Sequence, residues 1–85
     1  MQNNTAVVTF EAPKKTISVD LEVPLDISAN DLVKALNSAY GLGINEKDMK
    51  EWYLQAERPM VLLRGSKTLA DFGVRTGCII YFNRD

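Results

Sequence analysis

One stretch, residues 28–40, constrains the fold of this chain more than any other, because it carries the signals of a complete amphipathic helix. Ser28 stands at an N-cap position, and Asp31 follows three residues later, as in a capping box with Asp in place of Glu. Ile27, just before the cap, can form a hydrophobic staple with the helix. Gly41 is suited to the left-handed conformation that ends a helix. The sequence therefore predicts a helix over residues 28–40.

The apolar residues of this predicted helix share one face. They recur with a period of 3.6 residues and form a core-facing stripe, which consists of Leu32, Val33, Leu36, Ala39 and Tyr40. A helix of about twelve residues is roughly 18 Å long and marginally stable by itself in water. The stripe therefore needs a partner surface, which we expect to be a small sheet.

The segments on either side of the helix have the patterns of strands. Residues 16–23 alternate between apolar and polar side chains, and a turn at residues 12–15 joins them to an earlier strand at residues 5–11. After the helix, strands are expected at 51–57, 60–63 and 78–83, with one tight helical turn at 68–74. This order predicts an α+β roll in which the last strand lies parallel to the first in the middle of the sheet.

Composition narrows the class of protein. The 85 residues predict one domain, 1–85, with a frayed end at 1–4. A net charge of -1 and scattered basic residues argue against nucleic-acid binding. The single cysteine suits a reducing compartment. No apolar run is long enough to enter a membrane, and residues 1–4 lack the features of a signal peptide, so we expect a cytoplasmic protein.

Few side chains offer chemistry. The chain has no histidine, the commonest general base and transition-metal ligand. Cys78 could be a nucleophile only with a group that lowers its pKa, and the nearest basic residue is Arg75; we interpret Cys78 as a small buried residue of the last strand. The acidic and amide residues after the helix lack the pattern of a calcium loop and are interpreted as solvated: Asn45, Glu46, Asp48 and Glu51. We therefore predict a non-enzyme without cofactor, metal or small-molecule substrate.

The order of elements and several local motifs resemble ubiquitin, from about Val7 to Phe82. The most specific motif is residues 68–74, Thr-Leu-Ala-Asp-Phe-Gly-Val, which is similar to the Thr-Leu-Ser-Asp-Tyr-x-Ile signature before the last strand of that family. The resemblance implies a β-grasp fold, with a mixed four- to five-stranded sheet and one helix packed across one face. It also implies that Leu69 and the aromatic residue fill the core and that Asp71 bonds to the backbone of the turn.

The differences from ubiquitin bear on function. The chain ends at Asp85 without the Gly-Gly tail of conjugated modifiers and sulfur carriers, so we expect neither role, although a longer precursor stays an alternative. The tail-less end, the size and the long loop after the helix resemble the YukD/EsaB-like family associated with type VII secretion in Gram-positive bacteria. That resemblance implies an accessory or regulatory protein that binds protein components of the secretion machinery.

The candidate binding site consists of the residues that alternate with the core residues in the last strands. If Ile80 and Phe82 point into the core, then Tyr53, Ile79 and Tyr81 form an apolar, aromatic patch on the open face of the sheet. Ubiquitin-like domains commonly bind partners there, and tyrosine is favoured at interfaces. Such residues are also ordinary in strands, so both interpretations stay open. Trp52 is either a core residue or a binding anchor, and its alternation with Leu54 favours the core.

Overall fold

A computed structural model describes residues 4–45, 47 and 53–82 of the chain. The elements follow one another in the predicted order: β1 (Thr5–Ala12), a 3-10 turn η1 (Pro13–Lys15), β2 (Ile17–Pro24), α1 (Ala29–Tyr40), β3 (Leu54–Glu57), β4 (Val61–Leu63) and β5 (Ile79–Tyr81). The strands after the helix are shorter than the sequence predicted. The position of Trp52 lies outside the described residues.

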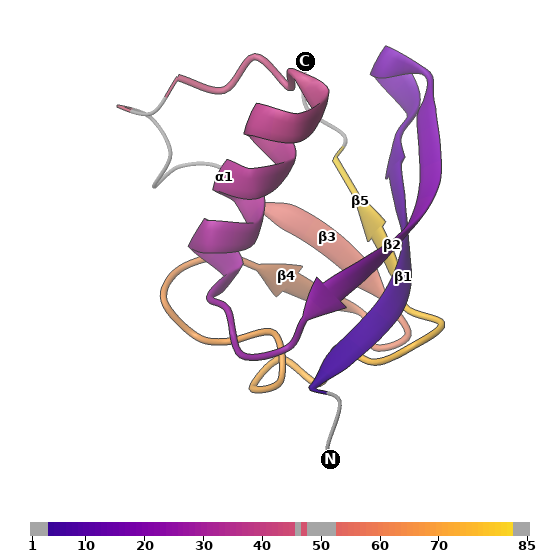
Figure 1. The fold of residues 1–85 in the computed structure, drawn as a ribbon, viewed down its shortest axis with the longest axis vertical. Helices are drawn as coiled ribbons and strands as arrows, with labels where there is room; N and C mark the ends of the chain where they lie inside the picture. Colours follow the sequence, from indigo (N-terminus) through magenta and orange to yellow (C-terminus); the bar gives the residue numbers. More distant parts are fainter. Residues whose placement is uncertain (1–3, 46, 48–52, 83–85) are drawn as a thin grey trace.

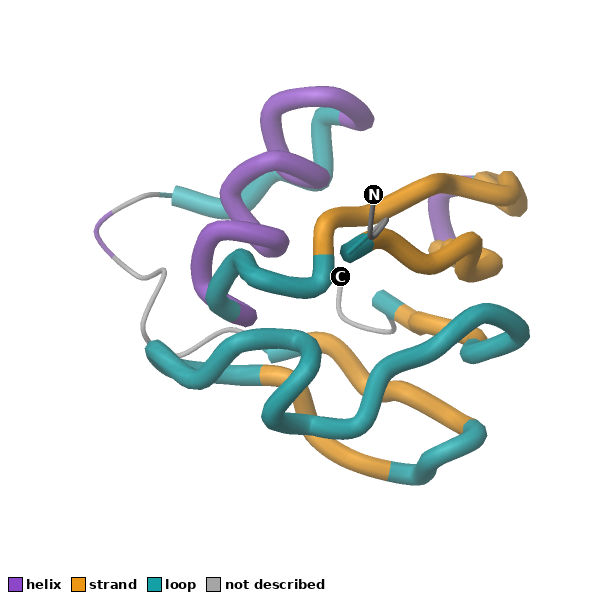
Figure 2. Tube along the Cα trace, turned by 60° about the horizontal axis from the view of Figure 1, so that its bottom comes forward, coloured by secondary structure: helices purple, strands orange, loops and turns teal. Residues whose placement is uncertain are grey.

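The five strands form one mixed sheet with the order β2-β1-β5-β3-β4. The central pair, β1 and β5, is parallel, and the other neighbouring pairs are antiparallel. The predicted parallel pairing of the first and last strands is therefore confirmed. Helix α1 lies to one side of the strands (Figures 1 and 2), so the sheet has one face toward the helix and one open face.

The core lies between α1 and the sheet. Its largest fully buried side chains come from four of the strands, from the helix, from the loop before β5 and from the residue after β5: Val8, Phe10, Val33, Leu54, Leu63, Leu69, Cys78, Ile80 and Phe82. Alternate residues of β1 are buried, as expected for a strand with one face in the core. The burial of Ile80 and Phe82 shows that these residues face the core and that Ile79 and Tyr81, which alternate with them, face away from it.

Both predicted helix ends are present. The Ser28 Oγ accepts a hydrogen bond from the Asp31 backbone N–H at 3.0 Å. At the other end, Gly41 has a φ of 62°, in the left-handed region, and its N–H donates to the Asn37 carbonyl at 2.9 Å. A residue with a Cβ would be strained in this conformation, which explains the glycine at this position.

The buried face of the helix differs from the predicted stripe at its two ends. Leu32, Val33 and Leu36 are buried as expected, and Ala29 is buried with them. Ala39, predicted to widen the stripe, is exposed instead. It lies at the border of the stripe on the side of β2, where a groove separates the helix from the strand.

The chain after the helix folds back under its end. Leu42 and Ile44 are both buried. The Asn37 side chain holds this segment with two hydrogen bonds, because its Nδ2 donates to the Ile44 carbonyl at 2.9 Å and its Oδ1 accepts from the Ile44 N–H at 3.0 Å. Asn37 thus replaces the strand or helix partners that the backbone of Ile44 would otherwise need.

The turn at residues 68–74 joins the helix start to the last strand. The Asp71 Oδ2 accepts from the Thr68 N–H at 3.3 Å, and the Thr68 Oγ1 accepts from the Asp71 N–H at 3.1 Å. Leu69 is fully buried and its N–H donates to the Ile27 carbonyl, while Phe72 is partly buried. The predicted roles of Asp71 and Leu69 are confirmed, and the aromatic residue contributes less to the core than expected.

Candidate functional site

The open face of the sheet is built from cross-strand rows that the strand register defines. In one row, Leu62 of β4 lies opposite Gln55 of β3, Gln55 opposite Tyr81 of β5, and Tyr81 beside Glu11 of β1. In the next row, Glu57, Ile79, Thr9 and Asp20 follow one another across β3, β5, β1 and β2. Each row crosses four of the five strands and mixes apolar with acidic side chains.

The structure places all three predicted site residues on or next to this face. Ile79 and Tyr81 alternate along β5 with the buried Ile80, so they point away from the core. Tyr53 immediately precedes β3 and has the parity of Gln55, which pairs with Tyr81. Tyr53 and Tyr81 are therefore diagonal neighbours on one face. All three side chains are half-buried.

Two further apolar residues on this face were missing from the sequence prediction. Leu62 of β4 and Val7 of β1 are each 47% exposed. The alternation of β1 was a usable signal for Val7, because its neighbours Ala6 and Val8 are buried. A strand of three residues, Val61–Leu63, is too short to reveal the parity of Leu62. We call the five residues Val7, Tyr53, Leu62, Ile79 and Tyr81 the open-face patch.

Carboxylates surround the open-face patch. The strand residues of this face include the four carboxylates Glu11, Asp20, Glu22 and Glu57 and, within the described strands β1 to β5, no lysine or arginine. Two of them accept cross-strand hydrogen bonds: Asp20 from the Thr9 hydroxyl at 2.9 Å and Glu22 from the Thr5 hydroxyl at 2.8 Å. The strand residues of the open face are therefore acidic, although the whole chain has a net charge of only -1.

The hydroxyl of Tyr81 is affected by this environment. Its pKa is raised above its ordinary value, first because its surroundings desolvate the phenolate and then because Glu57 and Glu11 repel it, with a hydrogen bond to Glu57 adding to the effect. Arg58 acts weakly in the opposite direction. Tyr81 therefore stays a neutral hydrogen-bond donor throughout the physiological pH range.

Cys78, the other candidate, lies in the core. Its side chain is 0% exposed and it is a free thiol. Burial raises its pKa, and a hydrogen bond from the Glu57 backbone and the charge of Arg75 offset this only in part. A buried thiol with a raised pKa has little of the thiolate character that a nucleophile needs. The structure thus places Cys78 as a packing residue.

Neither a metal centre nor a membrane span stands out in the described part of the chain. Among residues 4–45, 47 and 53–82, no group of three or more acidic, cysteine or histidine side chains could hold a metal ion. Three members of the acidic and amide group considered from the sequence, Glu46, Asp48 and Glu51, lie outside these residues. No helix described here has the length and apolar character required to cross a bilayer.

Comparison with solved structures identifies the fold. The chain superimposes on the C-terminal ubiquitin-like domain of mouse tubulin-specific chaperone e with a TM-score of 0.76, 11% identity, and coverage of 100% of this chain and 91% of that one. It superimposes on a ubiquitin-like domain from tubulin-binding cofactor B with a TM-score of 0.73, 22% identity, and coverage of 96% and 98%. These likenesses confirm the predicted ubiquitin-like β-grasp fold. A search of curated proteins finds no match.

The family is shown by a match over nearly the whole chain. The model of the family described as "WXG100 protein secretion system (Wss), protein YukD" matches residues 5–82, from the start of β1 to the residue after β5. This range contains the helix, every strand and the open-face patch. The chain therefore belongs to the YukD family of the WXG100, or type VII, secretion system, as its resemblance to that family implied.

Proposed function

We propose that this protein is a non-enzymatic interaction module, a cytoplasmic accessory component of a WXG100 secretion system that binds a protein partner through the open-face patch. The observation that carries the proposal is the gathering of apolar and aromatic side chains from β1, β5, β4 and the start of β3 on the face that α1 leaves open. Contiguous apolar patches with polar surroundings are typical of protein-interaction sites.

The side chains of the patch suit this role. Tyr53 and Tyr81 are half-buried, so part of the entropy of ordering their rings is already lost before a partner binds. Tyrosine combines a large apolar ring with a polar end, and it is enriched among residues that dominate binding energy. The raised pKa of Tyr81 keeps its hydroxyl neutral, and this hydroxyl is hydrogen-bonded to Glu57.

The carboxylates around the patch indicate the chemistry of the partner. Glu11 and Glu57 flank Tyr81 and Ile79 across the strand rows. A complementary surface would have an apolar centre and lysine or arginine residues at its rim. Rim charges act mainly on the association rate, so we expect the association rate to fall as the salt concentration rises.

The proposal is tested by photocrosslinking in cells of the native host. A photoreactive phenylalanine analogue at position 81 should crosslink to a component of the secretion machinery, identified by mass spectrometry, whereas the same analogue at the control position Lys34, on the exposed side of α1, should not. The double variant Tyr53→Ser, Tyr81→Ser should reduce both crosslinking from position 79 and the export of WXG100 substrates.

The outcome that contradicts the proposal is equally definite. If the double variant folds, as judged by its circular dichroism, and still supports full crosslinking and export, the open-face patch is not the interface. Crosslinks from position 34 that equal those from position 81 would also reject it, because they would place the partner on the helix side.

A further inference from the structure

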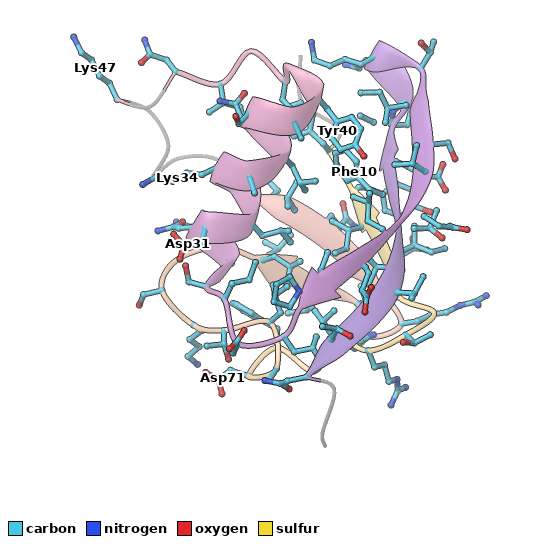
Figure 3. The ribbon with its side chains drawn as sticks, viewed as in Figure 1. Phe10, Asp31, Lys34, Tyr40, Lys47 and Asp71 are labelled. Atoms are coloured by element: carbon cyan, nitrogen blue, oxygen red, sulfur yellow. The ribbon has the colours of Figure 1, made fainter. Side chains whose placement is uncertain are left out.

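A second surface, separate from the open-face patch, lies between α1 and β2. It is an apolar groove of ≈ 480 Å³. Its apolar lining includes Leu21 and Val23 from β2, Ile27 from the loop before the helix, and Leu36, Ala39 and Tyr40 from α1. The Tyr40 ring lies between the helix and the hairpin, where its centroid is 5.6 Å from that of Phe10 (Figure 3).

The helix side of the groove has small side chains. Ala35 and Ala39 both line the groove and both are exposed. On the strand side, Leu21 is only half-buried although it points to the core face of the sheet, since its cross-strand partner Val8 is buried. The helix therefore covers β2 incompletely, and apolar surface that would normally belong to a core faces the groove.

The strand beside the groove is an edge of the sheet. Strand β2 has eight residues and is paired only with β1 among the described strands, whereas the other edge strand, β4, has three residues. A long edge strand presents a row of backbone N–H and C=O groups that can pair with another chain. Here that row runs directly beside an apolar groove.

The charged side chain along the groove is acidic. Asp31 lines it from the first turn of the helix and is exposed, and the lining residues include no lysine or arginine. Glu22 of β2 also borders the groove, but its carboxylate lies on the open face of the sheet, where it accepts from the Thr5 hydroxyl. An occupant that carries basic side chains beside its apolar ones would therefore be favoured over an acidic one.

We propose that β2 and this groove bind an extended segment of a partner protein, which adds to the sheet as a sixth strand. The lining includes Leu21, Glu22, Val23 and Pro24, so the added strand runs along about four residues of β2. Because side chains alternate along a strand, two apolar side chains of the segment enter the groove while its backbone pairs with β2. A lysine or arginine residue beside the apolar ones faces Asp31.

The test uses a displayed library of random ten-residue peptides selected on the intact protein. We expect enriched peptides to alternate β-branched or other apolar residues with polar ones and to carry lysine or arginine, since these are the features that the strand edge and the groove demand. An enriched peptide, made synthetically, should shift the amide NMR signals of β2 and of the α1 residues that line the groove.

Matched variants of the helix test whether the peptide binds in the groove or elsewhere on the surface. Ala39→Arg places a long side chain in the groove and should weaken binding of the peptide by about tenfold or more. Ser38→Arg, at the neighbouring exposed position outside the lining, should bind as the unmodified protein does. Circular dichroism of both variants shows whether each is folded. The Tyr53→Ser, Tyr81→Ser double variant should also bind normally, so this test is independent of the proposed function.

Several results would overturn the proposal. The first is the absence of an enriched motif, and the second is enrichment of apolar residues with helical spacing. If Ala39→Arg binds the peptide as tightly as the unmodified protein does, the groove is not the binding site. Two further peptides would be N-methylated at alternate residues, one along each edge of the peptide strand. If both bind as tightly as the unmethylated peptide, strand addition is excluded. A dimer in sedimentation analysis that Ala39→Arg dissociates would assign the groove to a second copy of the chain instead.

Discussion

The two hydrogen bonds between Asn37 and the backbone of Ile44 permit a quantitative prediction. They have lengths of 2.9 and 3.0 Å and are partly buried, and Ile44 itself is buried. A hydrogen bond of this kind contributes about 1 kcal/mol, and the loss of one partner leaves the other group unsatisfied. Alanine is a better helix former than asparagine by about 0.6 kcal/mol. We therefore expect Asn37→Ala to lower the free energy of unfolding by about 1–2 kcal/mol.

The measurement is urea unfolding followed by circular dichroism. With an m value of about 1 kcal/mol/M for a small domain, the midpoint should fall by about 1–2 M. Ser38→Ala is the matched control, because the neighbouring side chain is exposed; it should stabilise the protein by a few tenths of a kcal/mol through helix propensity. An unchanged midpoint for Asn37→Ala would refute the assignment of the two hydrogen bonds as the anchor of this segment.

Asn37→Asp gives a sharper version of the same test. One carboxylate oxygen still accepts from the Ile44 N–H. The other replaces the Asn37 Nδ2 and repels the Ile44 carbonyl, to which that nitrogen donates in the unmodified protein. We expect it to destabilise the protein at neutral pH at least as much as Asn37→Ala. Repulsion by the Ile44 carbonyl raises the pKa of this new carboxyl group. The loss of unfolding free energy should therefore shrink as the pH falls and the protonated group becomes a hydrogen-bond donor. A loss that does not depend on pH would contradict this account.

Three further predictions concern the core and the two candidate sites. Leu69→Ala should lower the free energy of unfolding by about 2–5 kcal/mol, and Leu62→Ala on the open face by less than about 0.5 kcal/mol, measured by urea unfolding; equal effects would contradict the assigned faces. Glu57→Gln should lower the pKa of Tyr81 in an ultraviolet titration, with Tyr81→Phe identifying its signal. Because this pKa is higher in the folded state, unmodified protein should lose stability above about pH 10. Iodoacetamide should label Cys78 slowly at neutral pH and rapidly in urea; rapid labelling of folded protein would contradict its burial.

Local sequence signals predicted most of the fold. The cap at Ser28 and the stop at Gly41 are local interactions within one turn, so they could be recognised without tertiary information. The strict alternation of residues 17–23 likewise identified β2 and its two faces. The parallel pairing of β1 with β5 followed from the order of elements and the family resemblance, because the pairing joins distant parts of the chain.

The surfaces were harder to predict than the elements. The parity of Ile79 and Tyr81 followed from their buried neighbour Ile80, but that of Leu62 depends on its register with Gln55. The exposure of Ala39 depends on where the helix lies over the sheet, which no local pattern specifies. The groove between α1 and β2 arises from that placement, and for this reason the sequence contained no sign of it.

The central position of β5 has a consequence for how the chain is made. Strand β5 pairs with β1 on one side and with β3 on the other, so it is the element that joins the two antiparallel pairs into one sheet. During synthesis the β1–β2 hairpin, α1 and the β3–β4 pair emerge first, and their common core stays incomplete until Ile79–Tyr81 has left the ribosome. Folding of this domain therefore waits until β5 has emerged, and a chain that stalls before β5 would expose its core side chains to chaperones and proteases.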